Sequence, residues 1–252
     1  MAKKEESELE KMVHRGKTAL PPRLVIYGSH GIGKSSIASQ FPKPIFLDTE
    51  DGLGTLEVDS IPIKNYQTMK ETVGYLVKDK HEWQTIVLDS VDWLSQPVIR
   101  DYIEDTHESK DLGYGKDHQL AAQLLQEILQ GFDVARRKVG MNIVILSHAI
   151  IQRYEDPRSD PYDRYVPDLQ RRSMMPLMEW CDALGFAAYD IHIRKSDKGF
   201  NKESSRGISS GERYLHFNET PAYMAKNRYA ISESILLDYD VLVDILPIHN
   251  AN

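Results

Sequence analysis

Short apolar runs alternate with stretches of helical character along the first part of the chain. The runs cover 24–27, 44–48, 85–89 and 142–147, and each has the length and β-branched content of a buried strand. Residues 35–41 predict a helix that closes before a proline, and apolar residues at helical spacing predict another over 117–138. Alternating buried strands and helices predict an α/β fold, a mostly parallel twisted sheet with helices on both faces.

The pattern changes after residue 148. Residues 151–172 are rich in Asp, Arg, Tyr and Pro and predict a long loop, which is usually functional or disordered. A short helix is expected to end near Asp182. Strand-like runs then follow at 184–193, 213–217 and 222–226, with a polar, flexible hairpin connection over 194–211. We therefore expect β-hairpin additions at the C-terminal side of the sheet.

Length and charge distribution indicate one main domain. The chain has 252 residues, 41% of them hydrophobic, which is enough for one large core. Residues 1–20 are charged and predict a mobile arm, 21–235 form the expected folded domain, and 236–252 are expected to be a C-terminal tail.

Composition excludes several classes of protein. A formal net charge of -7 argues against a surface built uniformly for nucleic acid, so any DNA contact must be local. Cys181 is the single cysteine, which leaves no internal disulfide and no zinc site made of several thiolates. No apolar run approaches the length of a membrane span, and the first residues lack an apolar stretch. We expect a cytoplasmic protein with no membrane partner.

A glycine-rich motif stands between the first strand and the helix that follows it. It fits G-x-x-x-x-G-K-[ST], whose amide N–H groups cradle phosphates at a helix N-terminus. Lys34 is expected to reach the β- and γ-phosphates of a nucleotide, and the Ser35 hydroxyl to bind Mg²⁺. The predicted nucleotide-binding residues are Gly28, Ser29, His30, Gly31, Ile32, Gly33, Lys34, Ser35 and Ser36.

Two carboxylates at strand ends complete the predicted site. Asp89 ends an apolar strand and is the natural Walker-B acid, which holds Mg²⁺ mainly through water. Ser90 follows it, so a residue elsewhere must position the attacking water, and Glu50 is the candidate. The guanine-reading motif N-K-x-D is missing from the sequence, which favours ATP over GTP.

These residues resemble the RecA-like recombinase ATPases, and more closely the small phage-encoded ATP-binding proteins of that superfamily, including Sak-type annealing recombinases. The resemblance covers about 22–230 and rests on the P-loop, Glu50, Asp89 and the strand that ends at His148. It implies a RecA-like ATPase core, with catalytic roles for Lys34 and Glu50. His148 stands where the family often has a glutamine that senses the γ-phosphate, which implies a sensing role for this histidine.

The resemblance also implies assembly. Lys226 and Arg228 look like the Lys-x-Arg signature that hexameric RecA-fold proteins insert into a neighbour's ATP site. It implies a homo-oligomer, ring or filament, with ATP at subunit boundaries. Single-stranded DNA is the expected partner, a single-strand-binding protein is a further candidate, and the cytoplasm is that of a bacterial host if the chain is phage-encoded. Lys226 and Arg228 could equally be solvated charges on an edge strand.

Two segments mix charges and rings in a way that suits single-stranded DNA. The loop after His148 has five arginines against five acids, so composition alone does not demonstrate a DNA site there. Residues 194–213 have six basic residues against three acids, a local balance of 6 - 3 = +3, and a solvated hairpin is the alternative. The candidate DNA-binding residues are Arg153, Tyr154, Arg164, Arg172, Lys195, Lys198 and Lys202.

The sequence therefore predicts a DNA-dependent ATPase that uses ATP and Mg²⁺ in recombination or annealing of single-stranded DNA. A helicase-like or motor ATPase of the same fold is one alternative, and strand unwinding or translocation would distinguish it. A small-molecule P-loop kinase is another, and it would transfer phosphate to a metabolite without responding to DNA. A nucleotide-dependent scaffold with negligible turnover is the third.

Overall fold

The fold comes from a computed structural model that describes residues 20–197, 203–232 and 234–250, with side chains described except at 109 and 191–209. The expected N-terminal arm therefore lies almost entirely outside the described residues. The first elements in chain order are β1 (Arg23–Gly28), α2 (Lys34–Ala38), β2 (Pro44–Asp48), β3 (Asp59–Pro62), α3 (Tyr66–Lys78) and β4 (Thr85–Asp89).

A continuous helical segment follows β4 and contains α4 (Val91–Trp93), the π-helical turn η1 (Leu94–Ile99) and α5 (Arg100–Thr106). The next elements are η2 (Ser109–Asp111), α6 (Lys116–Val134), η3 (Ala135–Val139), β5 (Asn142–Tyr154), β6 (Tyr162–Pro167) and α7 (Arg171–Trp180). The last are β7 (Ala183–Asp197), β8 (Glu203–His216), β9 (Lys226–Asn227), β10 (Ser234–Leu236) and α8 (Tyr239–Ile245).

The described strands form one ten-stranded sheet in the order β10-β8-β7-β1-β5-β4-β2-β3, with β6 paired to β5 and β9 to β7. The strands from β3 to β7 in this order are parallel, and β6, β8, β9 and β10 are antiparallel additions. The predicted α/β class is thus confirmed. Because β1, β2, β4 and β5 are parallel, their C-terminal ends meet at one edge of the sheet, where the P-loop begins.

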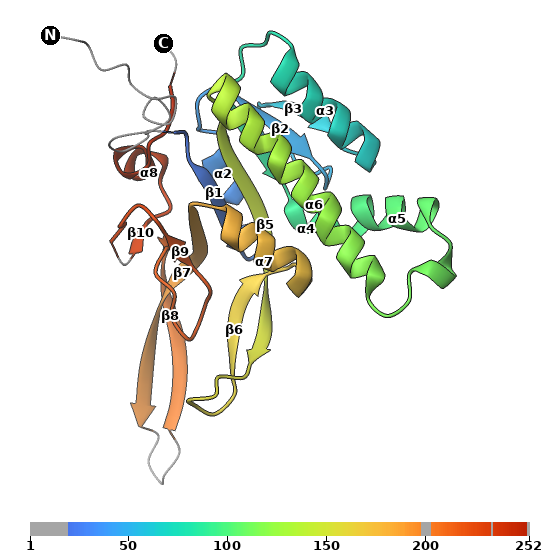
Figure 1. The fold of residues 1–252 in the computed structure, drawn as a ribbon. Helices are drawn as coiled ribbons and strands as arrows, with labels where there is room; N and C mark the ends of the chain where they lie inside the picture. Colours follow the sequence, from blue (N-terminus) through green and yellow to red (C-terminus); the bar gives the residue numbers. More distant parts are fainter. Residues whose placement is uncertain (1–19, 198–202, 233, 251–252) are drawn as a thin grey trace, which may run out of the picture.

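Helices cover both faces of the sheet (Figure 1). Alternation along β1 sends Val25 and Tyr27 to one core cluster, which also contains residues of α3, α6 and α7. Leu24 and Ile26 enter the other cluster, which contains residues of α2 and α8. Strands buried on both faces explain why their sequences are continuous apolar runs.

Two antiparallel ribbons extend beyond the P-loop edge in the same direction (Figure 1). We call β5–β6 the first ribbon and β7–β8 the second ribbon. The Tyr165 ring stacks on Phe186 with a centroid distance of 5.0 Å, and the Tyr165 N–H donates to the Ala222 carbonyl over 2.8 Å. These contacts hold the bases of the two ribbons side by side.

The first ribbon corrects the expectation of a loop over 151–172. Residues Ala149–Tyr154 pair in register with Tyr162–Pro167, so only the turn between them is irregular, and α7 already begins at Arg171. β-branched and aromatic residues opposite one another, such as Ile151 and Tyr165, support this pairing. Because the segment is dense in Asp, Arg and Pro and the exposed end of β5 lacks a regular alternation, the sequence predicts a loop.

Other boundaries also differ from the expected ones. The second ribbon is strand as far as Asp197 and again from Glu203, where a hairpin connection was expected. The strand expected at 222–226 is the two-residue β9, and α2 ends at Ala38. The expected C-terminal tail contains α8, whose Leu242 is fully buried in the second core cluster. None of the helices that the structure describes is both long and apolar enough to cross a membrane.

Candidate active site

The glycine-rich loop has the backbone that phosphate binding requires. Gly31 and Gly33 have φ angles of 72° and 105°, in the left-handed region that disfavours other residues. Gly33 is the N-cap of α2, so the first N–H groups of that helix are open to a ligand. The sequence thus builds an anion site between β1 and α2.

Lys34 lies in this site and is 6% exposed. Its Nζ donates to the carbonyls of Gly28 and Ser29, each over 3.1 Å. Burial lowers the pKa of Lys34, and the charges of Asp89, Asp92 and Glu50 oppose this effect. The ammonium is therefore held over the loop, where a phosphate oxygen can replace a carbonyl.

Ser35 and Asp89 supply oxygen ligands suited to Mg²⁺. The Ser35 hydroxyl donates to Asp89 Oδ2 over 2.6 Å. Burial raises the pKa of Asp89, the charge of Glu50 raises it further, and Lys34 and the Ser35 hydroxyl act in the opposite direction. A carboxylate and a hydroxyl beside the phosphate loop fit Mg²⁺, which prefers hard oxygen ligands.

Glu50 lies just after β2, beyond β5 and β4 from the P-loop strand, and it lines the same cavity as the P-loop. Asp48 Oδ1 accepts hydrogen bonds from the backbone N–H groups of Glu50 and Asp51, which fixes this turn. The Glu50 carboxylate accepts a short hydrogen bond from the Ser90 hydroxyl. The Ser90 hydroxyl therefore orients the Glu50 carboxylate.

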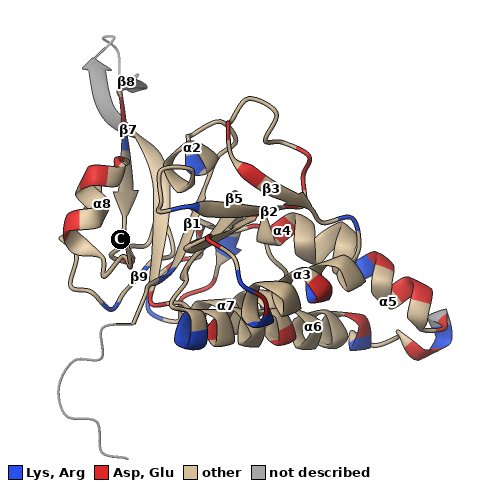
Figure 2. Cartoon of the chain, turned by 90° about the horizontal axis from the view of Figure 1, so that it is seen from above, with Lys and Arg blue, Asp and Glu red and all other residues tan. Residues whose placement is uncertain are grey.

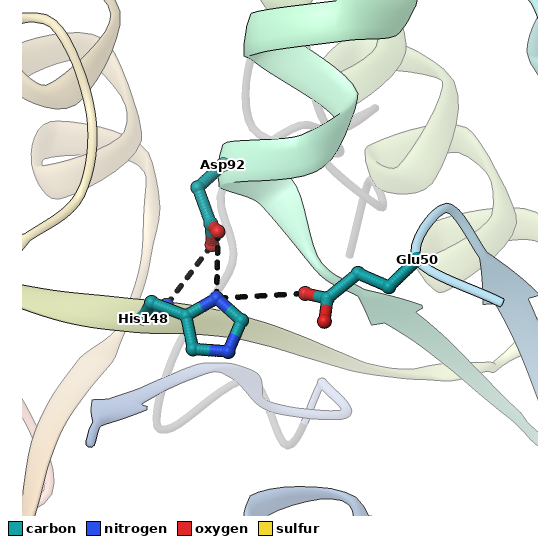
Figure 3. Close-up of side chains that lie close together, drawn as sticks. All are labelled: Glu50, Asp92 and His148. Carbon is teal, nitrogen blue, oxygen red and sulfur yellow. Dashed lines mark hydrogen bonds and ion pairs between the residues drawn. The ribbon is translucent and has the colours of Figure 1, made fainter. Parts of the chain in front are cut away.

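His148 ends the buried part of β5 and lies beside Glu50. Its Nδ1 lies 3.5 Å from Glu50 Oε1 and 2.8 Å from Asp92 Oδ2 (Figure 3). Asp92 Oδ1 also accepts from the His148 backbone N–H over 3.0 Å. The His30 ring of the P-loop stacks on His148 with a centroid distance of 3.8 Å. Asp92 is a residue of this site that the sequence did not reveal.

Glu50, Asp92 and His148 have ligand atoms within 4.8 Å of one another, as a metal site would. A metal-bound imidazole nitrogen needs its lone pair, however, whereas Nδ1 of His148 is hydrogen-bonded to Asp92. The hydrogen bond to Asp92 raises the pKa of His148 against the effect of burial. In this cluster Nδ1 of His148 is thus paired with Asp92, and Glu50 is a second carboxylate beside the ring.

The P-loop, Glu50, Asp89 and His148 line one cavity of about 290 Å³. Besides the P-loop residues it is lined by the turn after β2, which covers it from the other side. The lining residues outside the P-loop are Asp48, Glu50, Gly52, Thr55, Leu56, Asp89 and His148. The predicted Lys34, Ser35, Glu50, Asp89 and His148 are thus brought together.

Arg213 of β8 also reaches this site. Its Nη1 donates to the Ile32 carbonyl over 3.0 Å, and a Cβ at Gly33 would lie 2.5 Å from the same nitrogen. The second ribbon therefore contacts the P-loop backbone directly through Arg213. Sequence alone placed Arg213 only in a basic stretch, because the contact spans 181 residues.

Lys226 and Arg228 lie at the opposite end of the sheet from the P-loop. β9 pairs with the first residues of β7, beside Leu24, whereas Gly28 pairs with Ala187. Lys226 Nζ donates to the carbonyls of Met178 and Glu179 at the end of α7 over 2.5 and 2.9 Å. Arg228 Nη1 lies 3.2 Å from Asp182. Neither side chain reaches the site of its own chain, so their catalytic role stays a prediction about a neighbouring subunit.

Several of the candidate DNA-binding residues already have partners. Arg164 forms an ion pair with Glu219 over 3.0 Å, has a side chain 12% exposed, and lies 3.8 Å over the Tyr154 ring. Arg172 donates to the Gly115 carbonyl over 2.8 Å. Arg153 is exposed on the first ribbon.

Lys198 and Lys202 lie outside the described residues, and Lys195 lies in β7 with an undescribed side chain. Acidic side chains recur along α5 and α8, so these helices are poor surfaces for DNA (Figure 2).

The strand, glycine loop and helix at the sheet edge, with an acid on the strand two positions away, define a P-loop ATPase. Comparison with known proteins agrees with this class. A family model described as an AAA domain matches residues 20–229, and the chain belongs to this family.

Two individual proteins are similar to the chain. The SPbeta prophage-derived uncharacterized protein YorG of Bacillus subtilis (strain 168) is 24% identical over 225 residues, which are 86% of this chain. The chain spans 62% of the length of that relative. A crystal structure of the RadB recombinase is 15% identical, with a TM-score of 0.42, over 78% of this chain and 81% of that one.

Proposed function

We propose that the chain hydrolyses ATP in this cavity and couples hydrolysis to single-stranded DNA in recombination or annealing of the Sak type. The convergence of Glu50 and His148 on the P-loop carries the first part of the proposal. A cation after β1, an acid after β2 and an imidazole on β5 meet at one edge, and a phosphate-binding cation with a water-orienting acid supports in-line attack of water on a phosphate.

Each residue has a distinct role in this proposal. Lys34 neutralises charge on the β- and γ-phosphates, and Glu50 orients the attacking water. Ser35 and Asp89 would hold Mg²⁺, which supplies charge neutralisation on the phosphates when bound. The hydrogen bond from Ser90 holds the Glu50 carboxylate before the substrate arrives, which reduces the cost of orientation in the transition state.

Coupling to DNA is supported by how the first ribbon is connected. His148 and the ribbon belong to one uninterrupted strand, β5, so a ligand on the ribbon and a phosphate at His148 act on the same element. The second ribbon is connected to the P-loop through Arg213. The similar Bacillus subtilis protein is prophage-derived, which supports a phage origin for the chain.

ATP hydrolysis by the full chain, with and without single-stranded DNA, tests the proposal, and Lys34→Ala is the matched inactive control. We expect wild-type turnover that rises with single-stranded DNA and is absent in Lys34→Ala. Normal turnover in Lys34→Ala would overturn the P-loop assignment. Turnover that ignores DNA would overturn the coupling. Phosphate transfer to a metabolite would indicate a kinase, and strand unwinding would indicate a motor.

A further inference from the structure

We propose that Asp92 is a positioning residue for ATP hydrolysis, which holds His148 so that its second ring nitrogen faces the γ-phosphate. The proposal rests on the proposed function, because it deepens the part that His148 plays in the same site. It adds a residue that lies outside the P-loop, the Walker-B position and the position of the water-orienting glutamate.

The two hydrogen bonds between Asp92 and His148 carry the proposal. One carboxylate accepts both the backbone N–H of His148 and its ring nitrogen, over 3.0 and 2.8 Å. The backbone bond fixes where β5 passes Asp92, and the ring bond fixes the side-chain torsions. With Nδ1 directed at Asp92, Nε2 lies on the other side of the ring (Figure 3), and His148 lines the phosphate cavity.

Burial decides what the pair can do. Asp92 is 4% exposed and His148 is 8% exposed. A buried carboxylate without a cationic or hydrogen-bonding partner is costly, so Asp92 favours the protonated ring. Nε2 of a neutral ring with a proton on Nδ1 can only accept, whereas in the imidazolium it donates. A phosphate oxygen needs a donor, so Asp92 makes His148 suitable for the γ-phosphate.

The charged groups around His148 also favour its protonated ring, because together they raise its pKa. The hydrogen bond and charge of Asp92 raise the pKa of His148 and outweigh burial and Lys34, and Glu50 adds a smaller increase. Burial alone would raise the pKa of Asp92, but its bonds to His148 lower it. From the remaining elements, the His30 ring of the P-loop stacks on the imidazole, and Asp168, just after β6, interacts with it electrostatically.

A pH dependence follows with a definite sign. Because the pKa of His148 is raised in the folded protein, its imidazolium persists to higher pH than that of an ordinary histidine. Hydrolysis should therefore be lost as the pH rises through that raised pKa. Removing the charge of Asp92 lowers the pKa of His148, so the alkaline limb should move to lower pH.

The first experiment compares Asp92→Asn with Asp101→Asn, which removes an exposed carboxylate on the neighbouring α5. In Asp92→Asn we expect kcat to fall about ten- to a hundredfold, the scale known for carboxylates that orient metal-ligating histidines through the second ring nitrogen. The KM for ATP should stay within about twofold, and the alkaline limb should shift. Asp101→Asn should match the wild type. If both variants have the kcat of the wild type and the alkaline limb of the pH profile shifts in neither, the proposal is overturned.

The second experiment keeps the proposal testable if Asp92→Asn folds poorly or if wild-type turnover is low. NMR titration of His148 without nucleotide should give a lower pKa in Asp92→Asn than in wild type. If wild type does not hydrolyse ATP at all, the proposed function fails. The titration still tests whether Asp92 controls the protonation of His148. In kinetics, His148→Gln and the double variant should lose the same activity. A double variant that loses the product of the two single losses would show that Asp92 acts independently of His148.

Discussion

The Ser35 hydroxyl donates a 2.6 Å hydrogen bond to the Asp89 carboxylate, and this bond joins the P-loop to the strand two positions away in the sheet. The bond brings together the two oxygen groups that we assign to Mg²⁺. Its partners lie 54 residues apart, so the sheet order rather than the local sequence creates the site.

Asp89→Asn should therefore weaken the coupling between Mg²⁺ and hydrolysis. An amide keeps the hydrogen bond from Ser35 but loses the negative charge that attracts the ion. We expect turnover to need a higher Mg²⁺ concentration and kcat to fall at least about tenfold. A Mg²⁺ titration of ATP hydrolysis measures this effect, with Asp79→Asn, an exposed carboxylate after α3, as the control. Identical Mg²⁺ dependence in the two variants would contradict the assignment.

Glu50→Gln should keep ATP binding and stop hydrolysis. The amide can still accept from Ser90 and fits the same space, but it is a poor partner for an activated water. We expect kcat to fall by about 10²-fold or more, with the ATP dissociation constant changed less than about threefold. Single-turnover hydrolysis and equilibrium binding separate the two quantities. Normal hydrolysis by Glu50→Gln would mean that another acid orients the water.

Part of this site follows from the sequence for a topological reason. Glu50, Asp89 and His148 each stand at or just beyond the end of an apolar run, and parallel strands bring such ends to one edge. Asp92 lies on the first helical turn after β4, where an acid is common at any helix start. Its contact with His148 depends on the path of that turn, which no local pattern specifies.

The ribbons show a second limit. β5 is buried as far as His148, and its last residues are exposed. The exposed Ile150, Ile151 and Tyr154 stand among polar residues without a period of two, so the sequence predicts a loop instead. Arg213 is a similar case, because its contact with Ile32 joins segments that lie 181 residues apart in the sequence.

Arg213→Ala should weaken ATP binding by loosening the P-loop. The lost hydrogen bond to the Ile32 carbonyl is worth about 1 kcal/mol, which corresponds to roughly a fivefold increase in the dissociation constant. Equilibrium binding of ATP measures the change. Arg137→Ala, which removes an exposed arginine of η3, is the matched control and should bind ATP as the wild type does. Equal ATP affinities in the two variants would show that the hydrogen bond from Arg213 to Ile32 has no effect on nucleotide binding.

Arg153 and Arg164 should differ in their effect on DNA binding, although both lie on the first ribbon. Arg153 is exposed, so Arg153→Ala should weaken binding to single-stranded DNA and reduce the salt slope by roughly one. Arg164 is engaged with Glu219 and the Tyr154 ring, so Arg164→Ala should lower the melting temperature and leave the salt slope unchanged. Binding isotherms at several salt concentrations and thermal melts separate the two effects. The reverse pattern would move the DNA contact to the other face of the ribbon.

Lys226 and Arg228 allow a test of assembly in which each has a different expected role. Lys226 caps the last carbonyls of α7, so Lys226→Ala should lower the melting temperature. Arg228 has a side chain that is 52% exposed and forms an ion pair only with Asp182 among the described residues, so it is the better candidate to enter a neighbour's site. An arginine supplied in trans can accelerate hydrolysis by about 10³-fold or more. Arg228→Ala should therefore bind ATP but hydrolyse it slowly.

Mixing variants tests whether Arg228 acts between subunits. Arg228→Ala keeps an intact P-loop and Lys34→Ala keeps an intact arginine, so a boundary between the two contains one complete site and partial activity should return. The matched control mixes Arg228→Ala with the double variant Lys34→Ala/Arg228→Ala, which can supply neither group and should restore nothing. Wild-type activity per subunit should also rise with protein concentration. If mixing restores no activity and wild-type turnover is independent of concentration in a proven monomer, Arg228 serves only its ion pair with Asp182.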